Sequence, residues 1–228
     1  MLHLDNLSVS YGAKNIISGL SYDFNEEAVY AVVGKSGSGK STLMKAVASI
    51  VPHQGRVLWN GELLTPKTHR IALVPQTNGL IPWKTVAENI ALPSMLRGEW
   101  DENAMAELCA ELGINHLFKE YPHHISGGER QRVAMARAFL INPHVLLLDE
   151  AFGALDAITR EEVHRVFLRA FRRHPVTTLM VTHDIAEALT LARYLLIFRE
   201  GRIVETMKNP SASPADIPIL TKEIKEKL

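Results

Sequence analysis

A glycine-rich loop between an apolar run and a helix-forming segment constrains the fold of this chain more than any other feature. In order, the loop consists of Gly34, Lys35, Ser36, Gly37, Ser38, Gly39, Lys40 and Ser41. It follows the β-prone residues 28–33 and precedes the helical pattern 42–50, so it matches G-x-x-x-x-G-K-[ST] in the expected context. Glycines let successive backbone N–H groups face one anion, and the new helix adds the positive end of its dipole. The loop therefore predicts a phosphate site, in which Lys40 reaches the β- and γ-phosphates and Ser41 ligates Mg²⁺.

An apolar strand that ends in two carboxylates predicts the catalytic part of this site. Residues 145–148 are followed by Asp149 and Glu150, and open α/β sheets bind ligands at the carboxyl ends of their strands. We expect Asp149 to hold Mg²⁺, directly or through water, and Glu150 to polarise the attacking water as a general base. The alternative is a strand followed by a solvated acidic turn.

Short β-prone runs recur along the chain and alternate with helical patterns, which predicts an α/β fold. The runs are Leu2–Val9, Ala28–Val33, Arg56–Trp59, Arg70–Val74, Val145–Leu148, Thr177–Thr182, Tyr194–Phe198 and Arg202–Glu205. Several are apolar on both faces, which is typical of a parallel sheet that is covered on both sides. The more polar runs before residue 30 and between residues 55 and 75 fit an antiparallel subregion instead.

Two helical patterns are defined by apolar residues at helical spacing. The first begins after Asp101, a predicted N-cap, and places Cys109 on its apolar stripe before Gly113 ends it. The second places Ile158 on its apolar face and ends at Pro175. Because Cys109 lies on an apolar stripe, we expect it to pack in the core rather than act as a nucleophile.

Composition excludes several classes of protein. The 228 residues are 46% hydrophobic and 22% charged, which excludes a disordered, collagen-like or disulfide-scaffold chain. Lys and Arg together number 25, as do Asp and Glu, so no global basic field favours a nucleic-acid partner. A single cysteine fits a reducing compartment. We find neither a secretory signal nor the ~20 apolar residues of a membrane span, so we expect a cytoplasmic protein.

A second pair of glycines begins another predicted helix, just before the acidic strand. Ser126, Gly127, Gly128 and Glu129 lead into a helix that extends to Leu140. Ser126 and Glu129 form an S-x-x-E capping box, which is a structural explanation for the pattern. The two glycines are poor helix formers, and their position in the first turn is better explained if bare N–H groups meet a second anion.

Together these motifs resemble the ATP-binding cassette (ABC) ATPases, over nearly the whole chain. The glycine-rich loop resembles the Walker A loop, residues 145–150 the Walker B strand, and residues 126–129 the signature that separates this family from other P-loop proteins. The resemblance also implies a D-loop at residues 154–156 and a switch histidine at His183. On the residue alone, His183 could merely be a satisfied residue at the end of a strand.

The family resemblance implies a role for each matching residue. The implied catalytic residues are Glu150, His183 and the Q-loop glutamine Gln76, and the implied Mg²⁺ ligands are Ser41, Gln76 and Asp149. The residues expected to contact ATP are Tyr11, which would stack on adenine, Gly34, Lys35, Ser36, Gly37, Ser38, Gly39, Lys40, Ser41, Thr42, Ser126, Gly127, Gly128 and Asp156. The chain departs from the family pattern at Glu129, where Gln is usual, and at Ala151, where Pro is frequent. Neither departure removes a phosphate donor.

The resemblance also implies how the chain is organised and assembled. In this family the signature of one subunit completes the nucleotide site of another, so we expect a homodimer that closes on ATP. An ABC ATPase domain is expected over residues 1–207, with a helical subdomain at about residues 84–137 and a short tail at residues 208–228. The expected P-loop core is a mostly parallel sheet with an antiparallel β subregion.

The segment after Gln76 indicates what the ATPase drives. Residues 78–86 place apolar and aromatic side chains on an expected exposed loop, which is a candidate partner surface; the alternative is a loop folded onto its own core. With residues 89–93, this loop resembles the nitrate, sulfonate, taurine and thiamine-precursor class of bacterial ABC importers. That class implies transmembrane permease subunits, a solute-binding protein that acts indirectly, and a peripheral location on the cytoplasmic face of the membrane.

Two other functions are compatible with parts of this pattern. A soluble ABC-type ATPase that acts on nucleic acid or cofactor assembly would use the same site, although the chain shows neither a basic stripe nor a second cassette. A P-loop small-molecule kinase would bind ATP but has no use for the Ser126 signature. The solute itself cannot be named, because specificity belongs to other subunits.

Overall fold

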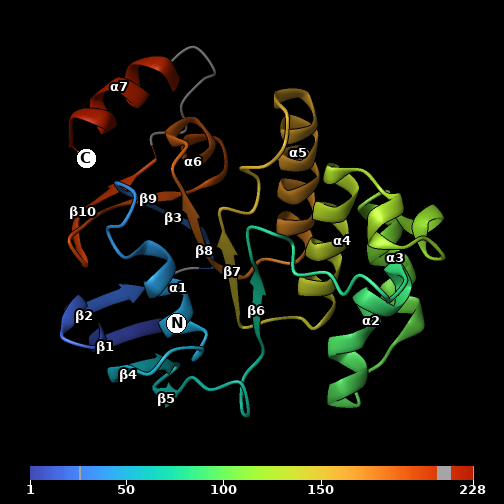
Figure 1. Cartoon of the computed structure of the whole chain (residues 1–228), viewed down its shortest axis with the longest axis horizontal. Helices are drawn as coiled ribbons and strands as arrows, with labels where there is room; N and C mark the ends of the chain where they lie inside the picture. The colour runs from blue at the N-terminus through green and yellow to red at the C-terminus, as the bar shows by residue number, and fades with distance from the viewer. Residues whose placement is uncertain (26, 210–216, 228) are drawn as a thin grey trace. The chain divides into compact units, whose positions relative to one another are not determined.

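The computed structural model describes residues 1–25, 27–209 and 217–227 (Figure 1). The chain forms two compact units. Unit 1 contains residues 1–71, 144–150 and 176–228, and unit 2 contains residues 72–143 and 151–175. Within the described residues, every helix is too short or too polar to cross a membrane.

Unit 1 begins with an antiparallel sheet. Its strands are β1 (Leu2–Tyr11), β2 (Lys14–Phe24), β4 (Gln54–Trp59) and β5 (Glu62–Leu63), in the order β2-β1-β4-β5 (Figure 1). Strand β1 is central, with Leu2 opposite Phe24 on one side and Trp59 on the other. The sequence patterns did not predict β2, because Gly19 (φ 63°) and several register shifts interrupt its alternation. The antiparallel region is confirmed, but β6 (Ile71–Val74), which we expected within it, is not one of its strands.

The second sheet brings three predicted motifs to one edge of unit 1. Its unit 1 strands are β3 (Val29–Val33), β7 (Val145–Asp149), β8 (Thr177–Thr182), β9 (Tyr194–Arg199) and β10 (Arg202–Lys208), in the order β10-β9-β3-β8-β7. All pairs are parallel except β10 with β9, and every residue of β3 and β8 is buried, as predicted for strands covered on both faces. Val33 pairs with Thr182, and Asp149 pairs with Val181. The carboxyl ends of β3, β7 and β8 therefore lie together.

Three helices complete the described part of unit 1. Helix α1 (Lys40–Val47) follows β3, α6 (Ile185–Leu191) follows β8, and α7 (Ile217–Lys227) contacts α6. Helix α6 begins after Asp184, whose carboxylate accepts the N–H groups of Ala186 and Glu187. In α7, Ile224 is buried, so the end of the chain adds to the core of this unit. Residues 210–216 of the expected tail lie outside the described residues.

Unit 2 is mostly helical. Its helices are α2 (Val86–Arg97), α3 (Glu102–Glu111), α4 (Gly127–Leu140) and α5 (Ala157–Arg173), with 3₁₀ turns at Asn115–Leu117 and Pro122–His124. Each of the four α-helices begins after a side-chain N-cap, at Thr85, Asp101, Ser126 and Asp156 respectively. Trp83, in the loop before α2, is 77% exposed, as the sequence predicts for that loop.

Two residues of unit 2 that were predicted to lie on apolar helix faces differ in burial. Cys109 is fully buried in α3, as predicted, and burial raises the pKa of its thiol to about 12, so it is not a reactive thiolate. Ile158 is 82% exposed, so its assignment to the apolar face of α5 was wrong. The buried face of α5 starts at Val163, and a residue five positions earlier points roughly 140° away around the helix.

Candidate nucleotide site

The glycine-rich loop connects β3 to α1 and encloses the ammonium group of Lys40. Gly39, at φ 106°, is the N-cap of α1, and no side chain caps the first turn. Lys40 is buried, and its Nζ donates to the carbonyl oxygens of Gly34 and Lys35, both at 2.8 Å. Burial lowers the pKa of Lys40, while two nearby carboxylates raise it. Uncapped backbone donors and a cation therefore meet in one loop, as an anion site requires.

Close packing explains part of the loop sequence. A Cβ added to Gly34 would lie 2.2 Å from the carbonyl oxygen of Phe198 in β9, so only glycine fits at this position. The hydroxyl of Ser38 is buried and has no hydrogen-bond partner among the described residues. Lys35, Ser36, Gly37 and Ser38 also line a second pocket, together with Phe198, Arg199 and Glu200. The loop thus presents polar groups that its own fold does not use.

Ser41 and Asp149 form the oxygen pair expected of a magnesium site. Ser41 Oγ donates to Asp149 Oδ1 at 3.0 Å, across the start of α1 and the end of β7. Burial is the main reason that the pKa of Asp149 is raised, while the hydrogen bond from Ser41 lowers it. No group of three His, Cys, Asp or Glu side chains in the described residues could hold a metal by itself. One hydroxyl and one carboxylate suit Mg²⁺, which takes few protein oxygens and completes its shell with water and substrate phosphates.

Glu150 and His183 face each other at the same edge of the sheet. His183 Nδ1 lies 3.5 Å from Glu150 Oε2, and the Glu150 N–H donates to the carbonyl oxygen of Val181 at 2.9 Å. Glu150 adopts φ 48°, a conformation uncommon for a residue with a side chain. The side chain of His183 is exposed. A carboxylate and an imidazole are therefore paired beside the phosphate loop, and the exposed imidazole can be reached from solvent.

One pocket of about 370 Å³ joins these groups in unit 1. Its lining residues are Ile16, Ser36, Gly37, Gly39, Lys40, Ser41, Thr42, Glu150 and His183. Sequence reasoning missed Ile16, because it lies on β2, which no pattern predicted. The Ile16 side chain packs against Gly39, where an added Cβ would lie 3.0 Å from its Cγ2. Tyr11, the expected adenine-stacking residue, ends β1 at 49% exposure and is not among the lining residues.

The signature segment forms the start of α4 in unit 2. Ser126 Oγ accepts the N–H of Glu129 at 3.3 Å, and Glu129 Oε2 accepts both the N–H and the O–H of Ser126. The predicted capping box is therefore confirmed. The hydrogen bonds from Ser126 are the main cause of the lowered pKa of Glu129. Ser126 itself is exposed, so a ligand can reach it from solvent.

The glycines of the signature have a packing role that the sequence did not reveal. A Cβ added to Gly128 would lie 2.5 Å from Thr159 Cγ2 in α5, and one added to Gly127 would lie 3.3 Å from Leu155 Cδ2. Close approach of α4 and α5 therefore requires glycine at position 128. The sequence favoured a second anion as the explanation for these glycines, and the structure adds this packing contact.

Gln76 and Asp156 also belong to unit 2. Gln76 follows β6 and is exposed. Asp156 is exposed at the N-cap of α5, where its carboxylate accepts the N–H of Thr159 at 3.0 Å, the main cause of its lowered pKa. Both residues lie in unit 2, and a role for either one at a nucleotide is still a prediction.

Comparison with known proteins decides the family. The sequence model of a family described as ABC transporter matches residues 17–153, more than half of the chain. The chain belongs to this family of ABC transporter ATPases. An aliphatic sulfonates import ATP-binding protein, SsuB 2 of Rhizobium johnstonii, is 38% identical over 94% of this chain and 84% of its own length. The SsuB protein of Yersinia pestis bv. Antiqua is 39% identical over 88% of this chain and 73% of its own.

A solved ABC structure supports the same fold. The structure of cbiO1 from Clostridium perfringens, described as part of the ABC transporter complex cbiONQ, aligns with a TM-score of 0.82. The alignment covers 99% of this chain and 93% of that one at 24% sequence identity. The predicted α/β P-loop fold of ABC type is confirmed. As an ABC transporter ATPase, the chain binds and hydrolyses ATP, and its family implies transmembrane permease partners.

Proposed function

We propose that this chain energises import of a small solute from the cytoplasmic face of the membrane. Two similar proteins are named as ATP-binding proteins for the import of aliphatic sulfonates. Residues 78–86 and 89–93 resemble the importer class for nitrate, sulfonates, taurine and thiamine precursors, so an aliphatic sulfonate is the first solute to test. The observation that carries the proposal is the unit 1 pocket, which gathers Lys40, Ser41 and Glu150.

The charged and polar residues of the pocket, with Asp149 beside Ser41, have distinct tasks in hydrolysis. The loop N–H groups and Lys40 bind the phosphates. Ser41 and Asp149 hold Mg²⁺, which when bound supplies positive charge to the phosphate oxygens. Glu150 accepts the proton of the attacking water, and His183, 3.5 Å away, positions the Glu150 carboxylate.

A second subunit completes the site. Ser126, Gly127 and Gly128 donate to the γ-phosphate bound by the other copy, so ATP stabilises a homodimer. Three further residues are assigned tasks by resemblance to the family: Tyr11 stacks on adenine, Gln76 is a further Mg²⁺ ligand and catalytic residue, and Asp156 acts in the D-loop. The ATPase domain spans residues 1–207, with a helical subdomain at about residues 84–137.

The permease contact is assigned to residues 78–86, which carry the exposed Trp83. An exposed indole is typical of the anchors of protein interfaces. A solute-binding protein would act through the permease and not on this chain. The membership of the chain in the ABC transporter family argues against the small-molecule kinase, which would have no second subunit to complete its site.

The proposal is tested by purifying the tagged chain from membranes of the organism that encodes it. A hydrophobic permease should co-purify, and the ATPase activity per subunit should fall on dilution because half a site hydrolyses poorly. A subunit that keeps its full specific activity at every dilution would contradict the shared site. Phosphorylation of an added metabolite would support the kinase instead.

A further inference from the structure

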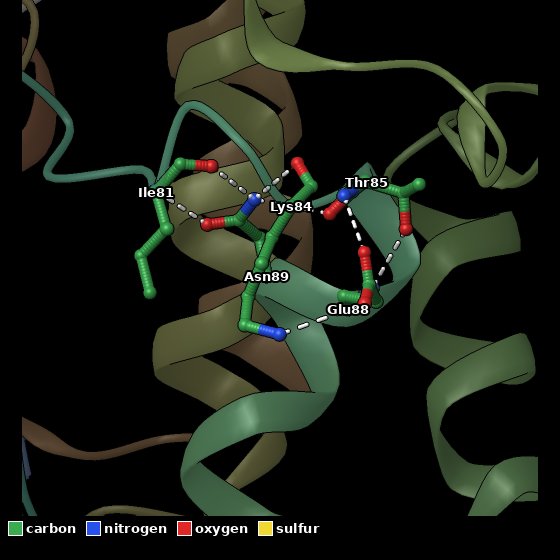
Figure 2. Close-up of polar contacts among 5 residues, drawn as sticks. All are labelled: Ile81, Lys84, Thr85, Glu88 and Asn89. Carbon is green, nitrogen blue, oxygen red and sulfur yellow. Dashed lines mark hydrogen bonds and ion pairs between the residues drawn. The ribbon is translucent and has the colours of Figure 1, made fainter.

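A buried asparagine holds the loop that carries Trp83. Asn89 in α2 has no exposed surface, and Figure 2 shows its amide directed at the loop before the helix. Oδ1 accepts the N–H of Ile81 at 2.7 Å. Nδ2 donates to the carbonyl oxygens of Ile81, Lys84 and Thr85, each at 3.0 Å. Nδ2 carries two protons, which these three carbonyl oxygens share, so a single side chain contacts four backbone groups of residues 81–85, which lie outside any helix or strand.

A surface capping box fixes the end of the same loop. The Thr85 N–H donates to Glu88 Oε2 at 2.7 Å, the Glu88 N–H donates to Thr85 Oγ at 3.2 Å, and Lys84 Nζ lies 3.5 Å from Glu88 Oε1 (Figure 2). These groups are more exposed than Asn89, and the partly exposed Lys84–Glu88 ion pair contributes little to stability. The buried amide of Asn89 is therefore the main constraint on residues 81–84.

The two residues between these anchors are exposed. Pro82 and Trp83 lie between Ile81 and Lys84, both of which Asn89 binds. Proline restricts its own φ, and Trp83 is 77% exposed. A large ring on a preformed loop loses little conformational entropy when a partner covers it, and such preorganisation improves affinity.

We propose that Asn89 is a positioning residue for transport coupling. It preforms residues 81–85 so that Trp83 meets the cytoplasmic segment of the permease in its bound geometry. This inference rests on the proposed function, specifically on the permease contact at residues 78–86. The partner surface is apolar and accommodates an indole ring, because Ile81, Pro82 and Trp83 offer no charge.

The test is binding of the purified chain to inverted membrane vesicles from the organism that encodes it, with the chromosomal copy deleted. Trp83→Ala and Asn89→Ala should each weaken binding at least tenfold. Asn89→Asp keeps the oxygen that accepts the Ile81 N–H but places an acceptor against three carbonyl oxygens, so it should weaken binding as strongly. The double variant W83A/N89A should lose little more than either single one, because both act through one contact.

Ser94→Ala is the matched control. Ser94 is a buried polar residue of the same helix, and its hydroxyl bonds the carbonyl oxygen of Ala91 rather than the loop. This variant should bind vesicles like the unmodified chain. Amide hydrogen exchange supplies a second readout, in which N89D should speed exchange of the Ile81 N–H while S94A does not.

The possible failures can be told apart. If W83A binds normally, the permease contact is elsewhere, and both that assignment and the role of Asn89 are overturned. If W83A weakens binding but both Asn89 variants bind normally, only the role of Asn89 is overturned. Additive losses in W83A/N89A, or equal losses in S94A, would show that Asn89 acts through stability alone. The ATPase activity of the purified chain in solution tests the nucleotide site, independently of the vesicle-binding results.

Discussion

Oε2 of Glu129 accepts hydrogen bonds from both the backbone N–H and the side-chain O–H of Ser126, at 2.8 and 2.7 Å. A hydroxyl has one proton, so the Ser126 O–H cannot donate to a phosphate while it donates to Glu129. Hydrogen bonds to an ionised acceptor are roughly twice as strong as neutral ones. The carboxylate therefore holds the signature serine more strongly than the glutamine usual in the family would.

Glu129→Gln should strengthen the ATP-dependent dimer. Measured on an E150Q background by light scattering, the ATP concentration for half-maximal dimerisation should fall about fivefold, roughly 1 kcal/mol. Glu88→Gln is the matched control, because it changes the same position of the capping box that begins α2. A dimer that forms equally well, or less well, in E129Q would contradict competition between Glu129 and phosphate for the Ser126 proton.

Gly128→Ala should destabilise the chain by about 1–3 kcal/mol, because the added Cβ would lie 2.5 Å from Thr159 Cγ2. Thr159→Ser removes that methyl group, so G128A/T159S should recover most of the lost free energy of unfolding in urea titrations. Gly127→Ala should cost less, because its nearest contact is the end of a flexible leucine at 3.3 Å. Equal instability of G128A with and without T159S would show that another contact requires this glycine.

The sequence predicted those parts of the fold that depend on local chemistry. The strands β3 and β7 are apolar on both faces up to Asp149, and the caps at Asp101 and Ser126 depend on residues within three positions. The phosphate loop was predictable because each defined position of its motif, whether glycine, lysine or serine, meets one chemical requirement of binding a phosphate group. The same reasoning correctly predicted that Asp149 and Glu150 lie at the carboxyl edge of the parallel sheet.

The parts that the sequence missed depend on long-range contacts. Strand β2 is held by pairing with β1 through register shifts, so its own alternation is poor, and Ile16 could not be assigned to the pocket. The need for glycine at position 128 comes from Thr159, thirty-one positions away in the chain. Ile158 was misassigned because the start of α5, and thus its buried face, depends on tertiary packing.

Lys40→Met should weaken ATP binding at least tenfold, because it removes the charged donor but keeps the buried stem. Calorimetric titration of the soluble chain measures the dissociation constant. Lys67→Met is the control, since it removes one positive charge at an exposed position of unit 1. An unchanged dissociation constant in K40M would remove Lys40 from the phosphate site.

Asp149→Asn should raise stability at pH 7 while abolishing ATP turnover. Burial raises the pKa of Asp149, so the folded state prefers its protonated form. The stability contributed by this group is full below the unfolded pKa, near 3.9, and is lost as pH rises through the folded pKa. A neutral amide of the same size removes that penalty, and Tm should rise by about 2 °C at pH 7 without nucleotide or Mg²⁺. The difference should shrink toward pH 3.

Asp156→Asn should shift Tm in the opposite direction. Hydrogen bonds from Thr159 lower the pKa of Asp156, so its contribution to stability is present above the unfolded pKa and is lost as pH falls through the folded one. D156N should therefore have a lower Tm than the unmodified chain at pH 7. If D149N lowers Tm at pH 7, as D156N is expected to do, burial of the Asp149 charge is not what limits stability at this site.

Glu150→Gln should separate nucleotide binding from hydrolysis. The amide keeps the size of the side chain beside His183 but cannot accept a proton, so turnover should fall at least ~100-fold. Nucleotide binding should persist, because Lys40 and the loop N–H groups are unchanged. The ATP-bound dimer should accumulate, because its ATP is not hydrolysed. Phosphate release and light scattering on the same sample measure both effects, with Glu62→Gln, an exposed change in β5, as the control. Steady-state hydrolysis retained in E150Q would assign the proton acceptor to another group, and the pairing of Glu150 with His183 would then be structural.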